Sequence, residues 1–113
     1  MPQNRKKLID LFIGHISEAV SHEILIRSTE NKEIASHYKK ELENLLDRSK
    51  KYREKINPKN SSLPEKDIDY IKTKIIIKVK TELKKRISLG YKNIDLGLIE
   101  ILVDKFLKEA KIS

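Results

Sequence analysis

The residues of this sequence best suited to chemistry are its histidines. Three potential metal ligands share one face of a helix near the N-terminus: His15, Glu18 and His22. A second helix could add Glu33 or Glu41, which lie close to His37 in the sequence, and so complete the ligands of a divalent metal. The same residues are also typical of the border of an amphipathic helix, where histidine pairs with a glutamate three or four positions away. We therefore expect no metal and no cofactor.

Nucleophilic catalysis has less support in the sequence. Ser21 and His22 are neighbours, as are Ser36 and His37, and adjacent residues on a helix do not face each other. The chain has no cysteine and only three, widely separated, glycines, which excludes thiolate chemistry and a glycine-rich phosphate loop. The sequence predicts a protein without catalytic activity.

The positive charge is the strongest functional signal. The chain of 113 residues carries 25 lysines and arginines against 17 acidic residues, and the whole excess of +8 lies within residues 31–90. Seven cations fall in one short stretch with Glu82 as its single anion: Lys72, Lys74, Lys78, Lys80, Lys84, Lys85 and Arg86. Such a concentration attracts nucleic acid, anionic lipid or an acidic protein, but it can also be a solvated surface that keeps the protein soluble.

Two tyrosines lie beside these cations. Tyr70 and Tyr91 fall outside the apolar stripes that predict the core. Stacking on bases is one use for such a residue, and covering a helix end is another.

Four amphipathic segments must position these side chains. Apolar residues recur at helical spacing in residues 5–27, 29–56, 63–89 and 94–110. Segments of this length, joined by short connections, predict an all-α antiparallel four-helix bundle that forms a single domain over residues 1–113.

The breaks between segments carry turn and capping signals. Residues 57–62 form a proline-containing loop, and Ser62 with Glu65 resembles a capping box. Ser28 or Thr29 is expected to cap the second helix. Gly90 suits the left-handed residue after the third helix, and Asn93 or Asp95 is expected to cap the fourth.

Most apolar residues follow the predicted stripes, and a few do not. In the first helix, Ser17 and Ser21 are expected on the polar face, opposite the apolar stripe. Ile24, Ile77 and Ile101 point away from their stripes, so we expect them to be exposed and available for self-association.

The third segment also fits a strand. Between residues 71 and 80, β-branched residues alternate with lysines, and a strand there followed by the turn at residues 90–95 resembles the ribbon-helix-helix DNA-binding family. The resemblance implies a ribbon at Lys74–Val79 that enters the major groove, and these lysines would face DNA: Lys72, Lys74, Lys78 and Lys80. Residues 81–89 are about a turn too short for the first helix of that family. The helical alternative keeps the Ser62 cap, and we adopt it.

The sequence also bears on location. A basic start and an apolar run at residues 8–13 imitate a signal peptide, but Asp10 and His15 interrupt the run, and no segment is apolar enough to span a membrane. We expect a cytoplasmic protein without membrane association. The abundance of lysine and isoleucine also suits a thermophile.

The sequence supports two functions. The first is non-specific electrostatic association with nucleic acid through the seven cations of residues 72–86. The alternative is a helical adaptor that binds a protein partner or forms a homodimer.

Overall fold

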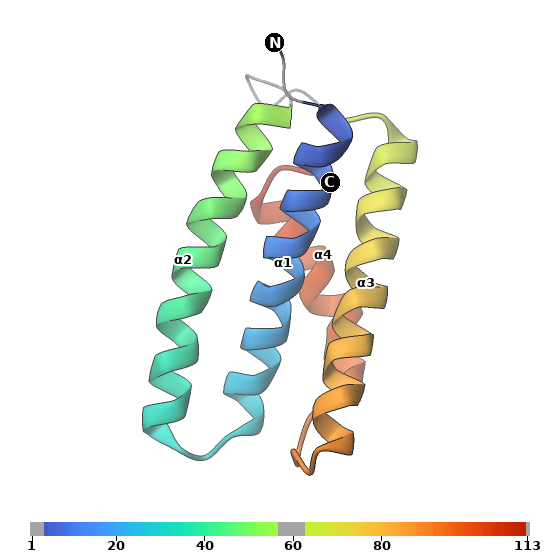
Figure 1. The fold of residues 1–113 in the computed structure, drawn as a ribbon. Coiled ribbons are helices and arrows are strands. Elements are labelled where there is room, and N and C mark those ends of the chain that lie inside the picture. The colour runs from blue at the N-terminus through green and yellow to red at the C-terminus, as the bar shows by residue number, and fades with distance from the viewer. Residues whose placement is uncertain (1–3, 57–62, 113) are drawn as a thin grey trace.

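The computed structural model describes residues 4–56 and 63–112. These residues form four α-helices and one short 3-10 helix, with no strand among them (Figure 1): α1 (Arg5–Ser28), α2 (Lys32–Ile56), α3 (Glu65–Ser88), η2 (Leu96–Leu98) and α4 (Ile99–Glu109). Consecutive helices run in opposite directions. The predicted antiparallel four-helix bundle is therefore confirmed.

The ambiguous third segment is helical throughout. Residues 71–80 lie inside α3, so the strand alternative and the ribbon-helix-helix arrangement built on it are wrong. Four apolar residues of α3 form one fully buried row: Ile71, Ile75, Val79 and Leu83. Burying each such side chain contributes about 1.5–3 kcal/mol, while β-branched residues lower helix propensity by less than about 1 kcal/mol each. The packing gain of a helical row outweighs the local preference for a strand.

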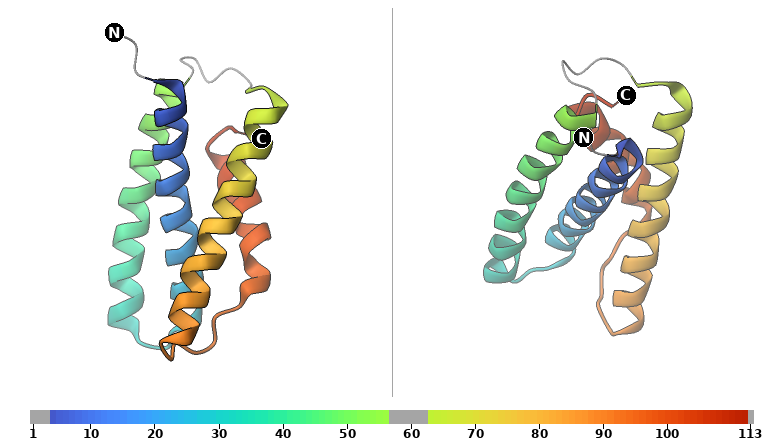
Figure 2. Two further views of the ribbon diagram at one scale, coloured as in Figure 1. Left: turned by 45° about the vertical axis from the view of Figure 1, so that its right-hand side comes forward. Right: turned by 45° about the horizontal axis from the view of Figure 1, so that its top comes forward.

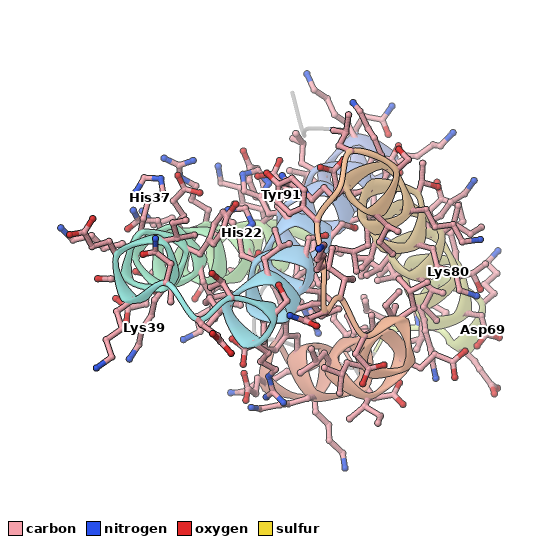
Figure 3. The ribbon with its side chains drawn as sticks, turned by 90° about the horizontal axis from the view of Figure 1, so that it is seen from below. His22, His37, Lys39, Asp69, Lys80 and Tyr91 are labelled. Atoms are coloured by element: carbon pink, nitrogen blue, oxygen red, sulfur yellow. The ribbon has the colours of Figure 1, made fainter. Side chains whose placement is uncertain are left out.

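α1 is the central helix of the molecule. It packs against α2, α3 and α4, and α3 also packs against α4. Seen from below in Figure 3, α1, α3 and α4 surround a common core, and α2 lies alongside α1 on the outside. Figure 2 shows the same arrangement from two further sides, with α2 and α3 flanking α1.

This central position overturns three expectations for α1. Ser17 and Ser21, predicted on an exposed polar face, are buried, and Ile24, predicted to be exposed, is only 1% accessible. A single apolar stripe suits a helix with one buried face, whereas α1 is covered by neighbours on several sides. Ile77 and Ile101 are exposed as predicted, at 53% and 65%.

The helix starts partly follow the predicted signals. Asn31, rather than Ser28 or Thr29, caps α2, because its side-chain oxygen accepts the backbone amides of the second and third residues of that helix at 2.9 and 3.1 Å. Asp95 caps η2 by accepting the backbone amide of Gly97 at 2.9 Å, whereas α4 itself starts after Leu98 without a side-chain cap, so the expected cap lies one element earlier than predicted. The predicted Ser62 cap and its loop lie outside the described residues.

The end of α3 is a Schellman motif. The amide of Tyr91 donates to the carbonyl of Arg86, and the amide of Gly90 donates to the carbonyl of Ile87, both at 3.0 Å. Gly90 has a φ of 104°, which confirms its predicted left-handed role. This motif fixes the direction in which the chain leaves α3, and with it the position of Tyr91.

A buried arginine links α2 to the C-terminal tail. Arg53 is almost completely buried and donates from Nη2 to the carbonyl oxygen of Lys111 at 2.9 Å. Burial lowers the pKa of Arg53. The sequence analysis did not predict this link, because the two residues lie 58 positions apart in the chain.

The middle of α1 offers a test of the packing. A Cβ added to Gly14 would meet no atom within 4 Å, and glycine in the interior of a helix costs about 0.5–1 kcal/mol relative to alanine. We predict that Gly14→Ala raises the free energy of unfolding by about this amount, measured by urea denaturation.

Gly90→Ala is the matched control, because the positive φ of Gly90 disfavours any side chain there. It should lower the free energy of unfolding. A loss of stability in Gly14→Ala would contradict the open space beside α1.

Candidate nucleic-acid interface

The outward face of α3 carries five of the seven predicted cations: Lys74, Lys78, Lys80, Lys84 and Lys85. All five are exposed, because the buried row of α3 faces the core and these positions fall outside it. None of them forms an ion pair with a carboxylate of residues 4–56 or 63–112. We call these five residues the lysine face.

The remaining two cations have partners. Lys72 bonds to Asp104 of α4 at 2.9 Å, and this hydrogen bond raises the pKa of Lys72. Arg86 donates to Glu82 at 2.9 Å. Burial lowers the pKa of Arg86, but the bond to Glu82 and the charge of that carboxylate outweigh it and leave the pKa raised. Lys72 and Arg86 are therefore structural as well as cationic, and they are not part of the lysine face.

The lysine face has two sides. Lys78 lines the groove between α1 and α3, and the Nζ of Lys74, one turn earlier, lies 5.9 Å from the ring centroid of Tyr70. Lys80 lies on the side of α3 away from α1, as Figure 3 shows. The charge is consequently spread around α3, in a form that can contact phosphates without reading bases.

Tyr70 has a structural role that the sequence did not predict. Its hydroxyl donates to Asp10 of α1 at 3.0 Å, and this bond raises the pKa of Tyr70. One turn earlier in both helices, Arg5 pairs with Asp67 at 2.6 Å. These two contacts align α1 and α3.

The groove between α1 and α3 holds about 420 Å³. Its floor is formed by α1, including Gly14, Ser17 and Ser21, and α3 contributes Lys78 and Arg86 to its wall. Two buried polar atoms on the α1 side, Ser17 Oγ and His22 Nδ1, have no hydrogen-bond partner in the described part of the chain. Acidic and basic side chains line the groove in equal number, so its charge favours neither sign.

The histidines do not form the metal site that the sequence left open. His15 donates from Nδ1 to the carbonyl of Leu11 at 2.8 Å and packs on the ring of Tyr52. His22 and His37 instead share Glu41, with their Nε2 atoms 2.6 and 3.0 Å from its two carboxylate oxygens. Within residues 4–56 and 63–112, no three histidine, cysteine or acidic side chains are placed to hold a metal ion.

The bond between His22 and Glu41 ties α2 to α1. The pair of His37 and Glu41 was open to prediction, because the two residues are one turn apart on α2. The bond from His22 was not, because it depends on the register between two helices. Glu41 has a lowered pKa, chiefly through its hydrogen bond with His22, and the contact with His37 lowers it further.

We found no family model, curated protein or solved structure that matches this chain. In the described residues, no helix is long and apolar enough to cross a membrane.

The lowered pKa of Glu41 gives a pH-dependent prediction. A carboxyl group whose pKa is lower in the folded state stabilises the fold above its ordinary value of 4.5, and this contribution is lost as the pH falls through the lowered pKa. We predict that Glu41→Gln lowers the free energy of unfolding by about 1 kcal/mol at most near neutral pH, since Glu41 is partly exposed to solvent.

Thermal unfolding at a series of pH values measures this effect. The difference between the wild-type protein and Glu41→Gln should shrink as the pH falls below about 4. Glu43→Gln, an exposed neighbour on α2, is the control and should change little at any pH. An equal effect of both variants would contradict the role of the His22–Glu41 bond.

Proposed function

We propose that this protein binds nucleic acid electrostatically through the lysine face of α3 and has no catalytic activity. One observation supports the proposal most strongly: all five lysines are exposed, and none has a carboxylate partner among the described residues. Placing like charges one helical turn apart, as at Lys74 and Lys78 or at Lys80 and Lys84, costs about 0.2–0.5 kcal/mol per pair. Neutralisation by a polyanion would remove that repulsion.

The length of the lysine face suits a phosphate backbone. Residues 74–85 rise about 16 Å along α3, and a strand of B-form DNA carries a phosphate about every 3.4 Å of axis. Lysine contacts phosphate as a flexible point charge, without the fixed geometry that reads a base edge. The proposal therefore specifies affinity that falls steeply with salt and depends little on sequence. We propose that the protein acts in the cytoplasm, where nucleic acids are abundant.

The adaptor function has an observation of its own. Ile77 and Ile101 are large apolar side chains left exposed on α3 and α4, as predicted for self-association. Ile77 lies among lysines, however, and Ile101 borders a shallow hollow with Asp104 and Lys108. Charged surroundings weaken the case for a homodimer or a protein partner on this surface, so the adaptor function is our second candidate.

Removing charge from one side of the lysine face tests the first function. We predict that Lys74→Gln, Lys78→Gln and Lys85→Gln together weaken binding to a labelled oligonucleotide by about 10- to 100-fold at low salt, and reduce the magnitude of the slope of log K against log salt by about 2 to 3. Fluorescence anisotropy with duplex and single-stranded oligonucleotides, between about 50 and 200 mM salt, measures both quantities.

A triple variant of α2 is the matched control: Lys39→Gln, Lys40→Gln and Lys51→Gln. It removes the same charge from exposed positions of another helix. Because salt screens charges beyond about 10 Å, it should weaken binding far less. If both triple variants lost the same affinity for oligonucleotides, binding would depend on the net charge of the protein and not on the lysine face. Binding to no oligonucleotide, with self-association by light scattering, would favour the adaptor function.

A further inference from the structure

A pocket lies where the connection between α1 and α2 meets the loop that follows α3. It holds about 480 Å³, within the usual range for small-ligand sites of about 300–1,000 Å³. Leu25, Ile34 and Tyr38 line one part of it. Tyr91 and Asn93 line the other, so that two segments far apart in the sequence form a single site. We call it the end pocket.

Two aromatic rings form walls of the end pocket, and both are held in place. The guanidinium of Arg86 lies 5.4 Å from the ring centroid of Tyr91, and its Nη1 donates to the Tyr91 hydroxyl at 3.4 Å. Tyr38 is half-buried, with the ring of His22 against it edge-to-face at 5.1 Å. Tyr91 is still 44% exposed. An exposed ring of this kind offers a surface on which a flat molecule can stack.

The polar groups of the end pocket suit the edge of a base. Asn93, whose backbone is left-handed with a φ of 64°, lines the end pocket together with Tyr91. An asparagine amide has both donors and acceptors, as base edges do. Lys92 adds a positive charge, and Glu30 adds a carboxylate that can accept from an exocyclic amino group.

The position of the end pocket connects it to the lysine face. Lys85 lies in the last turn of α3 and Lys84 directly before it, and the loop that carries Tyr91 follows the end of this helix. Figure 3 shows Tyr91 on the same side of the molecule as His22 and His37, over α1. A strand whose phosphates follow the lysine face would therefore reach the end pocket at the C-terminal end of α3.

We propose that the end pocket takes one unstacked nucleobase, and that the protein therefore prefers single-stranded nucleic acid to duplex. A base inside a duplex is stacked and paired, so it cannot enter without unstacking. A base of a single strand can turn out of the backbone and stack on Tyr91. This inference rests on the proposed function, since the phosphate contacts of the lysine face supply most of the affinity.

Substitution of Tyr91 tests this preference. We expect Tyr91→Ala to weaken binding to single-stranded DNA and RNA of one sequence by about 10-fold, while the affinity for duplex changes little. Tyr91→Phe keeps the ring and should bind as the wild type does. Leu89→Ala removes another large exposed side chain at the same end of α3, outside the end pocket, and should leave the ratio of single-strand to duplex affinity unchanged.

A fluorescent base gives a direct readout. In an oligonucleotide that carries 2-aminopurine, stacking on Tyr91 should change the base fluorescence with the wild-type protein and with Tyr91→Phe, but not with Tyr91→Ala. Circular dichroism of each variant confirms that the helices are retained. Comparing the affinities for DNA and RNA oligonucleotides of one sequence shows whether the sugar contributes to recognition.

The outcomes separate this inference from the proposed function. Equal affinity of wild type and Tyr91→Ala for single strands, with loss of binding in the triple lysine variant, would overturn the inference and leave the proposed function intact. A duplex that binds as tightly as the single strand would also overturn it. Absence of all oligonucleotide binding would overturn both.

Discussion

The packing of α1 against the three other helices is the constraint on which the rest of the structure depends. α1 is buried along most of its circumference, and it is the helix that contacts all the others. The row from Ile71 to Leu83, which is buried against the core, fixes the orientation of α3 about its own axis. Two polar contacts, from Arg5 to Asp67 and from Tyr70 to Asp10, add to the packing of α1 and α3.

That orientation decides which cations are free. With the row from Ile71 to Leu83 buried against the core, Lys72 lies next to α4 and pairs with Asp104. Arg86, nearer the same row, is held by Glu82 and Tyr91. The five residues of the lysine face lie outside this zone. The division between structural and free cations is therefore a consequence of the core, and not of the charge pattern.

Much of the fold could be predicted from the sequence because it depends on local signals. The helical spacing of apolar residues placed α1, α2 and α3 to within a few residues, and Gly90 marked the end of α3. The start of α4 was placed too early, because η2 precedes it. Side chains whose surroundings depend on a second helix were harder. Ser17 and Ile24 were misplaced because the sequence of α1 does not reveal how many neighbours cover it. Arg53 was missed because its acceptor, the carbonyl of Lys111, lies 58 residues away.

The candidate site likewise depends partly on local signals and partly on contacts between elements. The cluster of seven cations could be read directly from the sequence. Which of the seven are paired could not, because the partners of Lys72 and Arg86 become evident only in the structure. The end pocket joins two loops, so no local pattern could reveal it.

An NMR titration with a single-stranded oligonucleotide tests the central claim most directly. The account predicts that the largest changes in backbone amide shifts fall on the outward positions of α3 and on residues 91–93, and that the outer face of α2 is unchanged. Shifts concentrated on the lysines of α2, or spread evenly over every basic residue, would contradict it.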